Sequence, residues 1–233
     1  MRPTSPKWIL LAVVLLAAPL WARERTGELA PPEVKKEQDA IMKALETGNK
    51  HHMNNVSRKA GLAKIMVVSC ADSRVPPEVV FHMQPGELFT ARAFGNIVDK
   101  ELLATLEYGA EHLGCRVLVV MGHTDCSALK EAIEEHNHPR TEWRSLNQKA
   151  LYQELEPAVA EVEEDQRIAQ ARTGKTLEGA AFLDAVVRTN ILSTMHAIRE
   201  QSPLLWNLEN DDMIKIVACI YHLDSGKVEW LKQ

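Results

Sequence analysis

Two short segments of this chain bring together residue types that bind transition metals. Residues 70–74 (Cys-Ala-Asp-Ser-Arg) offer a thiolate beside a carboxylate and a guanidinium, and residues 123–126 (His-Thr-Asp-Cys) offer an imidazole and a second thiolate. Cys70, His123 and Cys126 form a three-ligand set that suits zinc and leaves a fourth position for water or substrate. The pattern therefore predicts a catalytic zinc site.

This interpretation has to be weighed against simple packing, because a free cysteine is most often a buried core residue. A structural zinc site normally offers four ligands, whereas this pattern offers three. The other two cysteines, Cys115 and Cys219, lie in or beside apolar runs, and we interpret them as buried free thiols. Asp72 and Arg74 can pair beside the first thiolate, which favours a catalytic site. A salt bridge that serves only stability is the alternative for that pair.

Each segment begins where a strongly apolar run ends. Residues 65–68 (Ile-Met-Val-Val) precede Cys70, and residues 117–121 (Val-Leu-Val-Val-Met) precede His123. Short runs rich in β-branched residues are typical of strands in a buried parallel sheet. Open α/β sheets bind their ligands at the carboxyl ends of such strands, so both segments are expected at the same edge of the sheet.

The remaining pattern alternates helices with strands, which predicts an α/β fold: a mostly parallel sheet with an antiparallel edge strand, flanked by helices. Asp99 is the expected cap of the helix that joins the second and third strands. The expected strands are 64–70, 87–92, 116–122 and 213–221, followed by an antiparallel strand over 228–231. The expected helical regions are 33–49 and 127–202, the latter interrupted near His138–Pro139, at Pro157 and at Thr173–Gly174.

Composition sets limits on the function. With 233 residues and 45% hydrophobic content, the chain can bury a sizeable core as a single domain, which we place at residues 33–233. A formal net charge of −5 provides no basic footprint, so no nucleic-acid partner is expected. The pairs His51–His52 and His136/His138 lie in polar segments without a carboxylate or cysteine at ligand spacing, and we interpret them as surface histidines.

The first 22 residues have the pattern of a secretory signal peptide. Arg2 and Lys7 precede an apolar run over residues 8–18, which is too short to span a bilayer comfortably, and Ala22 offers a small residue at the cleavage edge. Residues 23–32 are then a linker. An uncleaved membrane anchor is the alternative. We therefore expect export across the inner membrane to the periplasm, with no stable membrane association after cleavage.

From about Ile41 to Leu231 the sequence resembles the β-class carbonic anhydrases. The paired metal motifs, in this order and context, are very specific to that superfamily. The matching stretches are residues 69–74, 86–89, 92, 95–96, 106–108, 122–126 and 221–229.

The resemblance implies a site and an activity. The residues that match Cys70, His123 and Cys126 hold Zn²⁺ in the family, and those that match Asp72 and Arg74 form a catalytic dyad. The implied reaction is the reversible hydration of CO₂ to bicarbonate and a proton by hydroxide on zinc. A homodimer or a dimer of dimers is implied, and its second subunit would complete the CO₂ pocket.

The substrate pocket departs from the family pattern. Val98 and Tyr108 would line the CO₂ slot by resemblance. Ser127 stands where the family usually has Gly, so its Cβ is expected to narrow the pocket or shift the backbone. Phe94 stands where a small residue is usual, which makes the pocket wall bulkier. Members with a bicarbonate-controlled switch carry Trp where this chain has Val67.

Because Val67 replaces that tryptophan, we expect a site without the switch, in which Asp72 is paired with Arg74. Two other functions share the same ligand set. One is a hydrolase of carbonyl sulfide or carbon disulfide, and the other is a non-catalytic zinc-binding protein. The Asp72–Arg74 pair argues against the non-catalytic protein.

Overall fold

The computed structural model describes residues 32–53 and 63–232. The predicted signal peptide and nearly all of the predicted linker lie outside these residues. The chain divides into two compact units, Met1–Ser57 and Arg58–Gln233. The first contains helix α2 (Pro32–Met53), which confirms the predicted helix and extends it at both ends. Among the described residues, no helix is both long and apolar enough to cross a membrane.

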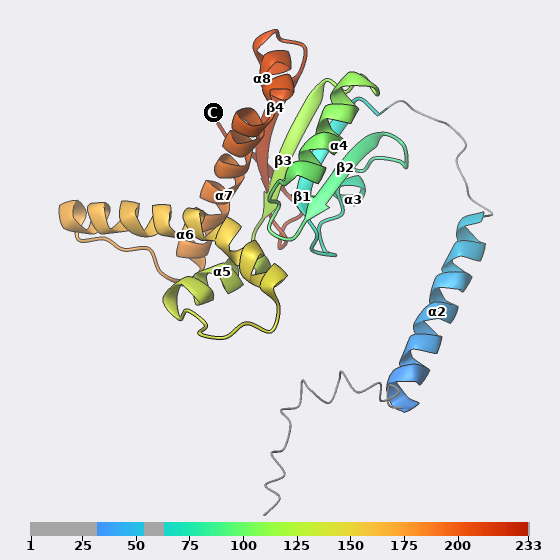
Figure 1. The fold of residues 1–233 in the computed structure, drawn as a ribbon, viewed down its shortest axis with the longest axis horizontal. Helices are drawn as coiled ribbons and strands as arrows, with labels where there is room; N and C mark the ends of the chain where they lie inside the picture. The colour runs from blue at the N-terminus through green and yellow to red at the C-terminus, as the bar shows by residue number, and fades with distance from the viewer. Residues whose placement is uncertain (1–31, 54–62, 233) are drawn as a thin grey trace, which may run out of the picture. The chain divides into compact units, whose positions relative to one another are not determined.

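The second unit is built on a five-stranded sheet with the order β2-β1-β3-β4-β5 (Figure 1). The first four strands run parallel, and β5 pairs with β4 in the antiparallel direction. This confirms the predicted α/β fold and its antiparallel edge, with strand ends within two residues of those expected. The strands are β1 (Ile65–Cys70), β2 (Leu88–Ala93), β3 (Val117–His123), β4 (Lys215–Tyr221) and β5 (Val228–Trp230).

Helices connect the strands, and residues with capping preferences lie at the start of α4 and at the end of α6. Asp99 caps α4, because its carboxylate accepts a hydrogen bond from the amide of Leu102 at 2.8 Å. Gly174 ends α6 in the left-handed conformation, with φ of 69°. The helices of this unit are α3 (Pro77–Val80), α4 (Lys100–Glu111), α5 (Ser127–Asn137), α6 (Leu146–Thr173), α7 (Gly179–Gln201) and α8 (Pro203–Asn210).

The prediction that Pro157 interrupts the helical region is wrong. Helix α6 runs through Pro157, whereas the breaks near His138–Pro139 and Thr173–Gly174 are confirmed. Proline removes one backbone hydrogen bond and strains the preceding turn, but it does not forbid a helix. Here the flanking residues Leu155 and Val159 are fully buried, so packing on the α5 and α7 side holds the helix together.

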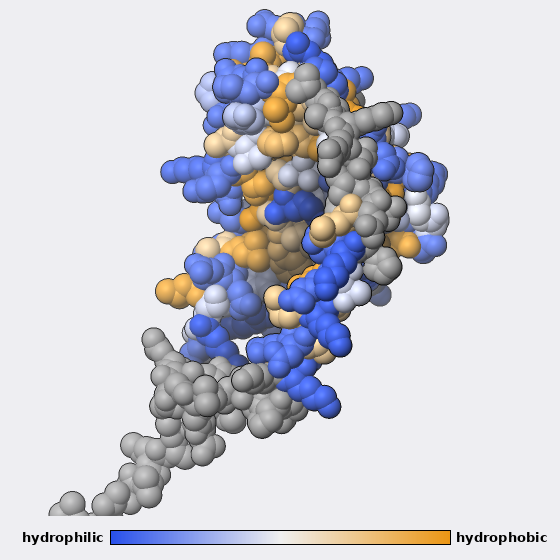
Figure 2. All heavy atoms as spheres, turned by 90° about the vertical axis from the view of Figure 1, so that its right-hand side faces the viewer, coloured by the Kyte–Doolittle hydropathy of each residue, from blue (hydrophilic) through white to orange (hydrophobic). Residues whose placement is uncertain are grey.

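The surface of the second unit carries apolar side chains among many charged ones. Figure 2 shows hydrophobic surface between hydrophilic side chains on the face turned to the viewer. Large apolar residues that are more than half exposed in this unit include Val79, Tyr108 and Trp230.

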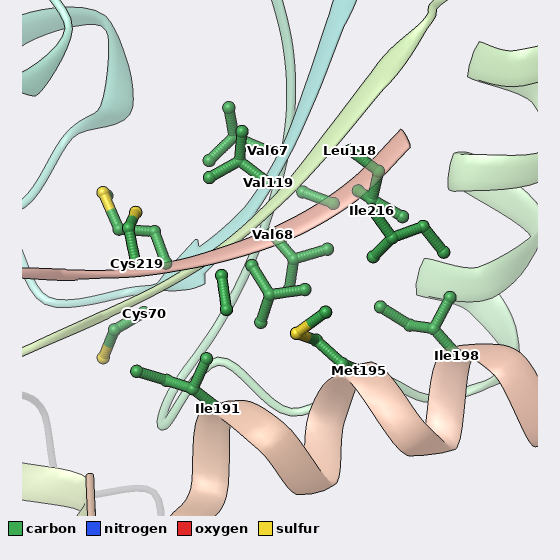
Figure 3. Close-up of a cluster of buried hydrophobic side chains, with 14 of the residues drawn as sticks. Val67, Val68, Cys70, Leu118, Val119, Ile191, Met195, Ile198, Ile216 and Cys219 are labelled. Carbon is green, nitrogen blue, oxygen red and sulfur yellow. The ribbon is translucent and has the colours of Figure 1, made fainter. Parts of the chain in front are cut away.

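The core lies on both faces of the sheet, and helices α4 and α7 cover one of them. Ile191, Met195 and Ile198 of α7 point toward the strands (Figure 3). Helix α7 comes close to β3 at Gly122, where an added Cβ would lie 2.5 Å from Ile191 Cδ1. The sheet side chains that face α7 include Val68, Leu118 and Ile216, and those on the opposite face include Val67, Val119 and Cys219.

Candidate metal centre

Three predicted ligands meet at the carboxyl edge of the sheet. Cys70 ends β1, His123 ends the neighbouring strand β3, and Cys126 directly precedes α5. Because β1 and β3 are paired and parallel, their ends lie at the same edge. The ligand atoms of all three residues lie within 4.8 Å of one another, and all three residues are buried. The structure thus brings together the residues predicted to hold the metal.

The imidazole of His123 is oriented as a metal ligand requires. Its Nδ1 lies 2.9 Å from the carbonyl oxygen of Thr124, so Nδ1 donates a proton there and Nε2 keeps its lone pair. Nε2 is buried and has no hydrogen-bond partner within the described part of the chain. A buried polar atom of this kind is costly unless something binds it. With two sulfurs beside it, the donor set fits zinc.

The thiolate form of Cys70 is favoured by its surroundings. A hydrogen bond from the Cys126 thiol is the largest cause that lowers the pKa of Cys70 to about 4. The backbone amides of Gly95 and Asp72 also donate to its Sγ, at 3.3 and 3.4 Å. The same contact raises the pKa of Cys126, because a thiol that donates to a thiolate keeps its proton. Zinc binding requires both sulfurs as thiolates and therefore releases this shared proton.

Gly95 can bring its amide to the sulfur only because it has no side chain. Its φ is 81°, and an added Cβ would lie 2.8 Å from Leu155 Cδ2. Two buried polar residues of α7 hold this turn in place. Asn190 donates to the carbonyl oxygen of Gly95 at 2.8 Å, and the hydroxyl of Thr194 accepts from Asn96 Nδ2 at 3.4 Å. Sequence reasoning missed both positions, although an Asn and a Thr four residues apart within an apolar helix were a usable signal.

The predicted pair of Asp72 and Arg74 is formed next to the metal ligands. Arg74 Nη2 lies 2.7 Å from Asp72 Oδ2, and Nε lies 3.0 Å from Oδ1, which is a bidentate arrangement. The hydrogen bond from Arg74 lowers the pKa of Asp72 to about 2, so the carboxylate is ionised at neutral pH. The expectation that Asp72 pairs with Arg74 is met, and the expected absence of a bicarbonate-controlled switch stays a prediction.

Arg92 fixes the backbone of the loop that carries this pair. Its guanidinium donates to the carbonyl oxygen of Cys70 at 2.9 and 3.0 Å and to that of Asp72 at 2.6 Å. The loop between β1 and α3 is therefore held by an arginine from the neighbouring strand β2. The position of Asp72 relative to Cys70 follows from this support.

The residues expected to line the substrate pocket are half-buried or exposed in this chain. Tyr108 is half exposed, and its ring stacks on His112 with ring centroids 4.6 Å apart. Val98 and Phe94 are half-buried, and Ser127 is exposed at the first position of α5. Their role as a pocket for CO₂ stays a prediction.

The prediction for His136 missed its carboxylate partners. The residue is half-buried, and both of its ring nitrogens lie 3.0 Å from carboxylates, Nδ1 from Glu156 and Nε2 from Glu163. The sequence pattern missed these partners because they come from α6, 20 and 27 residues away along the chain. They face different nitrogens, so the arrangement ties α5 to α6 and does not converge on one point as metal ligands do.

Comparison with known proteins places this site in a family. The carbonic anhydrase family model matches residues 65–228, which include all three ligands and the dyad. "Carbonic anhydrase 2" of Mycobacterium tuberculosis is 26% identical over 201 residues, which cover 81% of this chain and 90% of the relative. A carbonic anhydrase of Pseudomonas aeruginosa is 30% identical over 176 residues, which cover 72% of this chain and 73% of the relative.

Solved structures share the fold. A tetrameric β-carbonic anhydrase of Sordaria macrospora superposes with a TM-score of 0.64 at 17% identity, over 86% of this chain and 96% of that one. The Coccomyxa β-carbonic anhydrase in complex with acetazolamide superposes with a TM-score of 0.59 at 21% identity, over 88% of each chain. On the family match, the ligand set and this fold, the chain belongs to the β-carbonic anhydrase family.

Proposed function

We propose that this protein is a zinc-dependent carbonic anhydrase that interconverts CO₂ and bicarbonate. The observation that carries the proposal is the buried convergence of Cys70, His123 and Cys126 beside an ionised Asp72. The Nε2 lone pair of His123 and the sulfurs of Cys70 and Cys126 are the donors of a catalytic zinc centre, which leaves a fourth position open to water.

Zinc bound by these three residues would supply a nucleophile from water at modest pH and polarise a bound oxygen. With zinc bound, the carboxylate of Asp72 would be placed to accept a hydrogen bond from that nucleophile and to orient it toward the substrate. Arg74 keeps the carboxylate ionised and fixes its direction through two hydrogen bonds. The thiolates of Cys70 and Cys126 offset the charge of the metal, so activity is expected to favour alkaline pH.

The decisive experiment is stopped-flow CO₂ hydration by the zinc-loaded protein. We expect turnover that rises smoothly with pH and is absent from protein stripped of metal. The same preparation is then assayed with carbonyl sulfide and carbon disulfide. If the protein hydrolyses either gas but does not hydrate CO₂, that gas replaces CO₂ as the proposed substrate. If it acts on none of the three, the protein binds zinc without catalysing these reactions.

We also propose that the protein is exported to the periplasm. Support comes from the basic residues and the apolar run before Ala22. Fusion of residues 1–30 to a reporter should export it, and the mature protein should start near Arg23. An intact Met1 on protein recovered from the cytoplasm would contradict the proposal.

We propose that the active form is a homodimer or a dimer of dimers. Val79, Tyr108 and Trp230 are each more than half exposed in this chain, and large apolar side chains of this kind are expected at subunit contacts. If the resemblance to the family holds at this position, Tyr108 would line a pocket that a second subunit completes. Light scattering after size-exclusion chromatography measures the mass, and a monomer with full activity would contradict this proposal.

A further inference from the structure

The charged groups beside the metal centre form a series of alternating sign. Arg74 donates to Asp72, the same guanidinium donates to Asp125, and Asp125 accepts in turn from Lys130. The series starts on the loop after β1, crosses to the loop between β3 and α5, and ends on α5. It therefore links the two chain segments that contain the metal ligands, residues 70–74 and 123–126.

Arg74 divides its donors between two carboxylates. Its Nε and Nη2 face Asp72, whereas Nη1 lies 3.1 Å from Asp125 Oδ2 and Nη2 lies 3.2 Å from the backbone oxygen of Asp125. A carboxylate with two free oxygens can bind a guanidinium bidentately. Asp125 is therefore both a second anchor for Arg74 and a potential competitor of Asp72.

Lys130 limits this competition. Its ammonium group contacts Oδ1 of Asp125, whereas Arg74 contacts Oδ2, so the two cations share this carboxylate. The Nε and Nη2 edge of the Arg74 guanidinium contacts Asp72. The carboxylate of Asp125 therefore lies between two cationic groups, the ammonium of Lys130 and the guanidinium of Arg74.

The backbone of Asp125 adds an independent observation. Its φ is 59°, in the left-handed region that residues other than glycine rarely adopt and that Asp and Asn tolerate best. In this conformation the Asp125 side chain contacts Arg74. The side chains of Arg74, Asp125 and Lys130 are 44, 52 and 50% exposed, and ion pairs so exposed contribute little to stability. The effect of these ion pairs is therefore to orient the guanidinium of Arg74.

We propose that Asp125 and Lys130 are positioning residues that hold Arg74 in its bidentate contact with Asp72. The inference rests on the proposed function, because the dyad that they position is the one assigned to CO₂ hydration. It concerns side chains outside the three metal ligands and the dyad itself. Neither Asp125 nor Lys130 needs to touch the substrate.

The test uses the full-length zinc-loaded protein and four single variants. Asp125→Asn keeps the shape and tolerates the left-handed backbone but loses the charge, and we expect kcat/KM to fall roughly tenfold. Lys130→Met should lower kcat/KM about threefold, and Lys130→Arg should restore it to within about twofold because the charge and a donor return. Lys149→Met, an exposed lysine of α6 outside this series, is the matched control and should behave as wild type. Zinc content and melting temperature should not change in any of them.

Two further readouts separate positioning from a general effect. In an Arg74→Lys background the Asp125 and Lys130 substitutions should have no additional effect on kcat/KM, because they act through the guanidinium. Phenylglyoxal labelling of Arg74, followed by peptide mass spectrometry with Arg167 as internal reference, should be several-fold faster in Asp125→Asn than in wild type. Full additivity with Arg74→Lys, or equal labelling in the two proteins, overturns the proposal.

The labelling readout does not depend on catalysis. If wild-type protein fails to hydrate CO₂, the proposed function fails, and the labelling rate still decides whether Asp125 holds Arg74. If wild type is active while Lys130→Met matches Lys149→Met, the proposed function stands and the positioning role of Lys130 is excluded.

Discussion

The metal ligands and the outer charged residues Arg74 and Asp125 belong to the same two segments, residues 70–74 and 123–126, but have opposite surroundings. Cys70, His123 and Cys126 are at most 1% exposed, whereas Arg74 and Asp125 have side chains about half in water. The buried set includes a nitrogen without a hydrogen-bond partner among the described residues. Each polar atom of the exposed set discussed above has a partner.

This difference indicates two kinds of contribution to one site. Burying polar atoms without partners costs free energy, so the ligand set depends strongly on what it binds. Exposed ion pairs change stability little, so the outer set can be altered without loss of the fold. Substitutions in the first set should therefore remove the metal, and those in the second should change only the rate.

The largest effect is expected from the loss of a ligand. Cys126→Ala should abolish zinc binding and lower CO₂ hydration by more than about a thousandfold, because the metal supplies the nucleophile. Zinc content by mass spectrometry and stopped-flow assay measure the two losses together. Cys115→Ser is the matched control: Cys115 is buried and its thiol donates to the carbonyl oxygen of Ala63, a bond that serine can keep. Full zinc retention in Cys126→Ala would refute the assignment.

The next effect separates rate from metal binding. Asp72→Asn should retain zinc but lose about a hundredfold in kcat, because an amide cannot orient the nucleophile as a carboxylate does. Asp212→Asn, an exposed aspartate in a left-handed turn that asparagine also tolerates, should be unchanged. Unchanged turnover of Asp72→Asn across the pH range would show that the pair with Arg74 is structural only.

The same contrast explains how much could be predicted from the sequence. The ligands were predictable because local patterns place them: an apolar β-branched run before Cys70 and before His123 indicates strands, and parallel strands end at one edge. Asp72 and Arg74 are two residues apart, so their pairing could also be predicted from the local sequence. These predictions needed no knowledge of distant contacts.

Contacts between distant segments were not predictable in this way. Asn190 reaches the Gly95 turn from 95 residues away, and His136 meets two glutamates of α6. Pro157 was expected to break a helix because its local cost is real, but buried neighbours on α6 offset that cost. Tertiary packing decided each of these outcomes, and a single sequence does not contain the packing partners.

A third prediction tests the close approach of α7 that supports the buried set. Gly122→Ala would place a Cβ 2.5 and 2.7 Å from two carbons of Ile191, which is fully buried and has little room to move. We expect a loss of about 1–3 kcal/mol in the free energy of unfolding, measured by denaturant titration. Gly48→Ala in α2, where no atom of the described residues lies within 4 Å of the added Cβ, should leave stability equal or slightly raised. Equal stability of Gly122→Ala and wild type would contradict this packing.

The smallest effect concerns an exposed ion network that holds the edge strand β5. Glu229 accepts from Arg188 of α7 at 2.8 Å and lies 3.0 Å from His222 Nε2, so it ties β5 to a helix and to the preceding turn. The hydrogen bond from Arg188 is the main cause that lowers the pKa of Glu229 to about 2 from its ordinary 4.5. A carboxylate with a depressed folded-state pKa stabilises the fold above its ordinary pKa, and that contribution disappears as the pH falls from about 4.5 to about 2.

Glu229→Gln should therefore be less stable than wild type at pH 7, and the difference should shrink below pH 4.5. Because the side chain of Glu229 is 37% exposed, solvent screening limits the expected difference to about 0.5 kcal/mol. Urea titrations at pH 7, 5 and 3.5, with the exposed Glu142→Gln as control, measure it. A difference that grows in acid would have the wrong sign for a carboxylate held by Arg188. A difference that stays constant across the three pH values would show that this network does not depend on the charge of Glu229.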